Sequence, residues 1–212
     1  DAAVETLPLP SLDLRAGERD LRWRKLAVFR SPLSDLSGPT LFLDLDLVVV
    51  DSLEPFFALP GAFHIIRDDD LFRAKPLRRL NATRDRFKAT VGNSSVFRFE
   101  IGAHSDVLKT YTNDPASAAA AYENEQEFLT GQLAAQGLLQ YWPRGWCVSF
   151  KNDCVPRAAA SFWRDPVVPA GARIVVFAGT PKMSDVLAGD GQTWYRRIGS
   201  VDWLRRAWTD AM

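Results

Sequence analysis

One long hydrophobic stretch of the chain is interrupted by two acids. Residues 41–50 read LFLDLDLVVV, in which every position except Asp44 and Asp46 carries a large apolar side chain. Such an apolar run is typical of a strand that is buried on both faces. A carboxylate in that setting is costly unless it is paired, hydrogen-bonded or bound to a cation. We therefore predict that the two acids lie in, or at the end of, a central strand.

The patterns on either side predict alternating helices and strands. Apolar residues at helical spacing precede the acidic strand and end at Pro32, and Asp51 has the position of a helix cap after it. This alternation predicts an α/β fold. The predicted helices are residues 20–33, 51–57, 104–111, 115–136 and a last one beginning at Ser200 or Asp202, and the predicted strands are residues 41–50, 62–67, 94–102, 138–143, 146–150 and 172–179.

Composition describes an ordinary globular chain. Its 212 residues are 47% hydrophobic and 25% charged, which suits one domain with a substantial core. Residues 67–90 are rich in charge and predict a mobile surface loop. Lys and Arg together number 26, as do Asp and Glu, so net charge gives no argument for a nucleic-acid partner.

Three further features bear on the compartment and completeness of the chain. Cys147 and Cys154 are too few for a disulfide scaffold and predict reduced structural thiols. The absence of a signal peptide and of a long apolar run predicts a cytoplasmic protein. The chain begins with Asp1 and continues as an extended segment with Pro8 and Pro10, so we expect a piece of a longer protein.

The spacing of the two acids suits a divalent cation. In an extended Asp-x-Asp segment both side chains point the same way, and oxygen ligands suit Mg²⁺ or Mn²⁺. A cation held by Asp44 and Asp46 can neutralise a leaving diphosphate. The alternative is that two acids merely end a strand, but the apolar residues on both sides favour a functional role.

One family with this motif is the haloacid-dehalogenase-type phosphatases. Asp44, Asp46 and Val48 resemble their Asp-x-Asp-x-Thr/Val signature, which implies Asp44 as nucleophile and Asp46 as general acid/base. That family also needs a later acidic pair at the end of a strand. The acids in residues 67–70 come too early in the chain for this role.

Five segments in order resemble the bacterial GT-A glycosyltransferases of the family 8 type. They are WRKLAVF (residues 23–29), LFLDLDLVVVDSLEPFF (41–57), VGNSSVFRFEIG (91–102), ENEQEFL (123–129) and VVFAGTPKM (175–183). The resemblance implies a mixed, mostly parallel sheet flanked by helices, a single domain over residues 1–212, and transfer of a hexose from a nucleotide diphosphate sugar.

The resemblance also implies roles for individual residues. Asp44 and Asp46 would hold Mn²⁺ or Mg²⁺, and Gly179 and Lys182 would steady the diphosphate. A sugar cleft would be lined by Asn93, Ser94, Ser95, Glu125 and Gln126. Apart from the resemblance, Lys25 and Arg22 are candidates to reach a phosphate, although a solvated helix face is the favoured interpretation for both. Each of these residues also has an ordinary structural reading as a turn, a helix start or a surface charge.

Two departures from the family pattern qualify this expectation. The third metal ligand of the family, a histidine, is replaced by Ala178, so either water completes the site or the domain is degenerate. Only 43 residues precede Asp44, which is too short for the nucleotide-binding half. Either the chain is truncated at its N-terminus or that half is lost, and the absence of an initial Met favours truncation.

The expected function is therefore a glycosyltransferase acting on a glycan or lipid-linked acceptor, with a nucleotide-sugar as donor and no nucleic-acid partner. The alternatives are the phosphatase and a degenerate, non-catalytic domain that binds a sugar or a partner. The last helix, WLRRAW, could lie on the inner face of the membrane, or simply dock on the domain. His64 and His104 lack ligand spacing and predict structural or surface roles.

Overall fold

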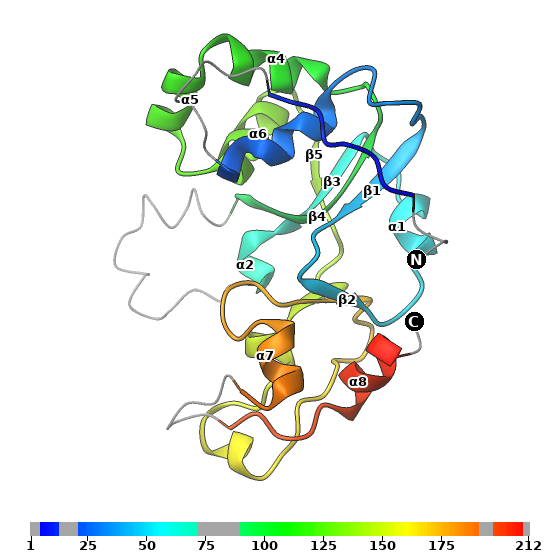
Figure 1. Ribbon diagram of the computed structural model, residues 1–212, viewed down its shortest axis with the longest axis vertical. Coiled ribbons are helices and arrows are strands. Elements are labelled where there is room, and N and C mark those ends of the chain that lie inside the picture. The colour runs from blue at the N-terminus through cyan, green and yellow to red at the C-terminus, as the bar shows by residue number, and fades with distance from the viewer. Residues whose placement is uncertain (1–4, 13–20, 72–89, 191–196, 210–212) are drawn as a thin grey trace.

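The computed structural model describes residues 5–12, 21–71, 90–190 and 197–209. The fold is built on two small sheets. The four-stranded sheet has the order β1-β4-β3-β5, and the three-stranded sheet has the order β2-β7-β6. Helices flank these mixed sheets at both ends of the molecule (Figure 1), which confirms the α/β class. The strands are β1 (Pro39–Leu43), β2 (Leu47–Val49), β3 (Phe63–Arg67), β4 (Gly92–Glu100), β5 (Leu139–Tyr141), β6 (Cys147–Ser149) and β7 (Ile174–Val176).

Pairing within the two sheets is mixed, as expected, but among the described strands the antiparallel pairs outnumber the parallel ones, so the expectation of a mostly parallel sheet is wrong. Strands β1 and β3 lie antiparallel to β4, and β2 lies antiparallel to β7. The parallel pairs are β3 with β5 and β6 with β7.

The prediction of one central strand over residues 41–50 is wrong. The chain leaves the four-stranded sheet after Leu43 and enters the three-stranded sheet at Leu47, so the run forms two strands in different sheets. In the part of the chain that the structure describes, each is an edge strand with one neighbour. The run is nevertheless apolar because β1 has a covered surface on both sides: Phe42 packs against the helices, and Leu41 and Leu43 pack between the sheets.

Helices η1 (Leu21–Phe29), α4 (Ser105–Asn113), α5 (Pro115–Ala121) and α6 (Glu125–Ala135) cover one face of the four-stranded sheet. The predicted single helix over residues 115–136 is interrupted, because two side chains cap separate helices. Asp114 accepts a hydrogen bond from the Ser117 amide (3.0 Å), and Asn124 accepts one from the Glu127 amide (3.0 Å). The second cap fixes where α6 begins.

Apolar side chains fill the space between the two sheets. A second apolar layer covers the outer face of the three-stranded sheet. Alternation along β7 supplies both layers, with Ile174 and Val176 between the sheets and Val175 on the outer side. Helices α7 (Met183–Ala188) and α8 (Asp202–Thr209) cover that outer side. Leu204 of α8 is fully buried there, so the last helix docks on the domain.

Short helices complete the described chain. They are α1 (Glu54–Ala58), α2 (Asp68–Leu71), η3 (Phe150–Cys154) and η4 (Ala158–Phe162). Asp51 does not cap α1 as predicted; its carboxylate pairs with Arg173 at 3.2 Å. The loop predicted over residues 67–90 begins instead with the end of β3 and with α2, because Leu71 is buried. Residues 72–89 of that prediction lie outside the described residues.

Cysteines and histidines have the structural roles that the sequence predicted. Both thiols are free and buried, and burial raises the pKa of each, that of Cys154 to about 12. His64 is buried against the ring of Trp142, and His104 is buried beside Phe63. Over the described residues, every helix is too short or too polar to cross a bilayer.

Candidate functional site

The two acids sit where the chain passes from one sheet to the other. The Asp44 amide donates to the Ser95 carbonyl of β4 (2.9 Å), and the Phe177 amide, next to β7, donates to the Asp46 carbonyl (2.8 Å). Each end of the bend is thus fixed to a different sheet. Leu45 between them is 99% exposed. The Cα atoms of the two acids lie within about 7 Å of each other, the reach of two extended residues.

Asp44 forms a close ion pair with Lys25 of η1. The Lys25 Nζ lies 2.8 Å from Asp44 Oδ1 and 3.0 Å from Oδ2. The same ammonium donates to the carbonyl and to the hydroxyl of Ser94, both at 3.1 Å. The side chains of Lys25 and Asp44 are only 21% and 26% exposed. Lys25 therefore lies inside the site and not on a solvated helix face.

Ser94 and Glu125 complete this cluster. The Ser94 hydroxyl donates to Glu125 Oε1 at 2.7 Å, and Lys25 Nζ lies 3.9 Å from the same oxygen. Glu125 is the first residue of α6, where the helix dipole favours a carboxylate.

An irregularity in β4 turns Ser94 toward that cluster. The register slips between β3 and β4, since Ile65 pairs with Phe97 but Ile66 pairs with Asn93. Extra residues in one strand re-aim the side chains that follow. Val96 consequently packs between the sheets, while Ser94 faces the helices.

Asp46 belongs to a second, more exposed ion pair. Its Oδ2 lies 2.8 Å from Nζ of Lys182, and the two side chains are 34% and 50% exposed. Lys182 precedes α7, and its amide donates to Asp185 Oδ2 (2.7 Å). Gly179 adopts φ +77°, a left-handed conformation that favours glycine, and a Cβ there would lie 3.4 Å from Nζ of Lys151.

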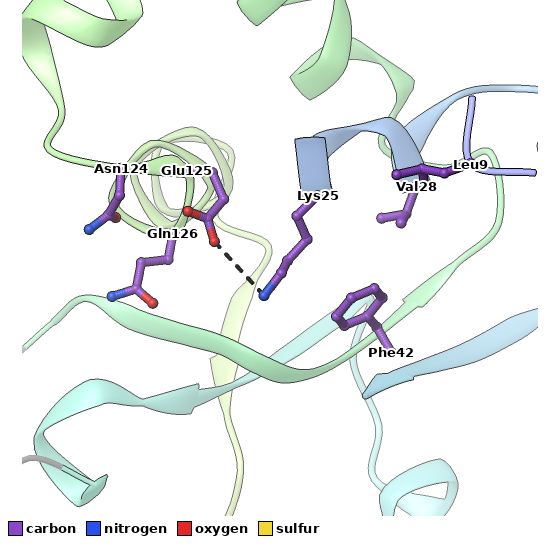
Figure 2. Close-up of a pocket in the computed structure, with 7 residues that line it drawn as sticks. All are labelled: Leu9, Lys25, Val28, Phe42, Asn124, Glu125 and Gln126. Atoms are coloured by element: carbon purple, nitrogen blue, oxygen red, sulfur yellow. Dashed lines mark ion pairs between the residues drawn. The ribbon is translucent and has the colours of Figure 1, made fainter. Parts of the chain in front are cut away.

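A pocket of about 520 Å³ adjoins the cluster formed by Lys25, Asp44, Ser94 and Glu125. Figure 2 shows Lys25 and Glu125 pointing toward each other across it, with the Phe42 ring beneath the lysine. The Lys25 ammonium lies 5.2 Å from the centre of that ring. Leu9 and Val28 make its apolar side, and Asn124, Glu125 and Gln126 make its polar side. A pocket with one apolar and one hydrogen-bonding wall suits a ligand such as a sugar or a nucleoside.

Comparison with known proteins identifies the architecture. No family model and no curated protein matches the chain. Among solved structures it is similar to the galactosyltransferase LgtC in complex with donor and acceptor sugar analogs, with a TM-score of 0.51 and 15% identity over 76% of this chain and 59% of that one. It is also similar to an active-site mutant of LgtC in which glutamate replaces a glutamine, with a TM-score of 0.53 and 13% identity over 89% of this chain and 66% of that one.

The chain has a GT-A-like fold. It spans 59% and 66% of the length of the two LgtC chains. At 15% and 13% identity the similarity establishes the fold alone.

The predicted site residues fall into three groups. Asp44, Lys25, Ser94 and Glu125 are in contact with one another, and Gln126 lines the adjoining pocket. Asp46 and Lys182 form the second ion pair, with Gly179 in the same segment after β7.

Asn93 and Ser95 make a third group with different contacts. The Asn93 side chain donates to Asp68 of α2 (3.2 Å) and accepts from the Ser95 amide (3.1 Å). Both residues are buried, and their contacts shape the irregular part of β4 that presents Ser94.

Phe42, Asn124 and Lys151 join the site although the sequence did not single them out as site residues. Phe42 of β1 is two residues before Asp44, which follows that strand, so alternation could have placed the two on one side of the chain. Asn124 is recognisable as a helix cap. Lys151 comes close to Gly179 only through the parallel pairing of β6 with β7.

The two acids at the bend offer carboxylate oxygens, which are ligands that suit Mg²⁺ or Mn²⁺. The number of such ligands is small. Within the described ranges, no group of three or more His, Cys, Asp or Glu side chains comes together. Ala178 packs its methyl group against the cluster between the sheets. Asp44 and Asp46 would therefore supply two ligands, and a phosphate and water would supply the rest.

Proposed function

We propose that this chain is part of a glycosyltransferase that moves a hexose from a nucleotide diphosphate sugar to a glycan or lipid-linked acceptor. The observation that carries the proposal is the bend at Asp44 and Asp46, where a lysine meets each acid in a GT-A-like fold. Paired carboxylates and ammonium groups beside a pocket suit a ligand that carries phosphate charge.

The departing diphosphate needs positive charge in the transition state. Asp44 and Asp46 would hold Mn²⁺ or Mg²⁺, which supplies part of that charge when bound. Lys182 adds a mobile ammonium group, and the left-handed turn at Gly179 brings the backbone close to the phosphates. Lys25 fixes the orientation of the Asp44 carboxylate.

The sugar and the acceptor would occupy the pocket beside Lys25. Glu125 and Gln126 lie on its polar wall, where a carboxylate and an amide can accept and donate hydrogen bonds to sugar hydroxyls. Ser94 holds Glu125 in place through their 2.7 Å hydrogen bond. Asn93 and Ser95 support this arrangement through β4.

The test is calorimetric titration of a panel of nucleotide diphosphate sugars in the presence of Mn²⁺. It uses this chain and, in parallel, the full-length product of its gene. We expect one donor to bind, with the affinity reduced at least tenfold in Asp46→Asn and unchanged in Asp35→Asn, an exposed acid away from the bend. Absence of binding to every donor by the folded full-length protein would refute the proposal. A phosphoaspartate trapped at Asp44 would instead identify a phosphatase.

A further inference from the structure

The two lysines at the bend differ in how firmly they are held. The Lys25 ammonium contacts both oxygens of Asp44 and two oxygens of Ser94, so its three hydrogens are fully used. Among the described residues, the Lys182 ammonium has one charged partner, Asp46. With side chains 50% and 34% exposed, that pair is close to a surface ion pair, which is easily broken.

The base of the Lys182 side chain is nevertheless fixed in place. Its amide bonds to Asp185 at the start of α7, and the preceding strand is bonded to the Asp46 backbone through Phe177. The four-carbon stem can therefore swing while its attachment point stays beside Asp46. A flexible unbranched stem with an ammonium group of three rotatable donors permits this movement.

An ammonium group occupies each acid of the bend before any ligand arrives, Lys25 on Asp44 and Lys182 on Asp46. A divalent cation alone would have to displace the Lys182 ammonium from Asp46, and a diphosphate alone would find that ammonium already paired. A cation and a diphosphate together bring nearly cancelling charges, and the diphosphate offers a new partner to the displaced ammonium.

We propose that Lys182 is an exchangeable counter-ion of Asp46. In the free protein its ammonium neutralises Asp46; when ligands bind, Asp46 passes to a divalent cation and Lys182 passes to the diphosphate. Cation and diphosphate consequently bind cooperatively, and each binds weakly alone. This inference rests on the proposed function for the identity of the ligand, but its test needs neither a sugar nor a nucleotide.

The probes are Mn²⁺ alone, inorganic pyrophosphate alone and the two together. Free Mn²⁺ is measured by electron paramagnetic resonance, and total binding by calorimetry, with correction for the complex that forms in solution. For the unaltered chain we expect pyrophosphate to raise the affinity for Mn²⁺ at least tenfold. Lys182→Met should bind Mn²⁺ alone about three- to tenfold more tightly, because a competing positive charge is gone. The same variant should bind the Mn²⁺–pyrophosphate pair about tenfold more weakly.

Opposite changes in the two affinities are what distinguish exchange from a purely structural role. Lys182→Arg keeps the charge and should stay near the unaltered chain in both measurements. Lys109→Met removes an exposed lysine of α4 and should change neither. The proposal is overturned if Lys182→Met leaves the affinity for Mn²⁺ alone unchanged or lowers it, or if Mn²⁺ binds equally well with and without pyrophosphate. Failure of every nucleotide-sugar to bind would leave these outcomes intact and would count against the proposed function alone.

Discussion

Replacing Lys25 by methionine should destabilise the protein, because it leaves two carboxylates inside the site without their counter-ion. Methionine keeps the unbranched stem and removes only the ammonium group. Asp44, 26% exposed, would lose its partner at 2.8 Å, and Glu125, 12% exposed, would lose the nearby ammonium while it keeps the hydrogen bond from the Ser94 hydroxyl. The effect therefore measures the ion pair and the hydrogen bonds of the Lys25 ammonium, separately from the packing of its stem.

The magnitude follows from the exposure of the partners. Exposed ion pairs contribute about 0.2–1 kcal/mol, and removing one partner of a fully buried pair costs about 3–5 kcal/mol. Lys25 and Asp44 lie between these limits, so we expect Lys25→Met to lower the free energy of unfolding by about 2–3 kcal/mol. In a chain of this size each kcal/mol shifts Tm by roughly 2–4 °C, which predicts a fall of about 4–12 °C.

Scanning calorimetry and urea unfolding at pH 7 measure both quantities. Arg24→Met, at the exposed neighbouring position of η1, should change the free energy of unfolding by less than about 0.5 kcal/mol. In a double-mutant cycle, Asp44→Asn should cost less in the Lys25→Met background than in the unaltered chain, with a coupling of about 1–2 kcal/mol. A Tm for Lys25→Met within 1 °C of that for Arg24→Met, or a coupling near zero, would refute the reasoning.

Three further outcomes are expected. Burial and, to a smaller extent, the guanidinium of Arg98 lower the pKa of His64 from 6.5 to about 4. Between these two pH values the unfolded chain therefore binds more protons than the folded one. The free energy of unfolding should consequently fall by roughly 3 kcal/mol as the pH drops from about 6.5 to about 4. Urea unfolding across this range should show the slope, and His64→Gln should flatten it. Cys147 and Cys154 should be inert to a thiol reagent in the folded protein at pH 8 and should react in urea, because burial raises the pKa of both thiols; rapid labelling of the folded protein would contradict this. Gly179→Ala should cost about 1–2 kcal/mol for its left-handed backbone, and Gly137→Ala, at φ +70° with nothing within 4 Å, should cost about the same in the same unfolding assay, because a Cβ at Gly179 would lie at an ordinary van der Waals distance of 3.4 Å from its nearest atom. A much larger loss at Gly179 would contradict this.

Local patterns in the sequence located most strands and helices. Residues 62–67 and 94–102 correspond closely to Phe63–Arg67 and Gly92–Glu100, because alternation and apolar content are properties of the segment itself. The break in residues 41–50 is different. Whether such a run joins one sheet or two depends on β4 and β7, which come much later in the chain, so no local pattern could show it.

The sequence named most residues of the candidate site, but it did not show how their side chains contact one another. Glu125 and Ser94 meet because a register slip between β3 and β4 changes the direction of the Ser94 side chain. Such a slip depends on how two strands pair, so the sequence of one segment cannot show it. The sequence also left open which way the Lys25 side chain points. Helix η1 is a 3₁₀-helix with about three residues per turn, so faces assigned at 3.6 residues per turn are displaced along it.

The bend at Asp44 and Asp46 also limits how this chain can vary. Its two ends are hydrogen-bonded to different sheets, and the strands on either side have fixed partners. Adding or removing one residue between them would slip β1 or β2 by one position and exchange its inward and outward side chains. Point substitutions at Leu45, which is fully exposed, leave both ladders untouched. Among related sequences we therefore expect the identity of the middle residue to vary freely, while the spacing of two positions between the acids stays constant.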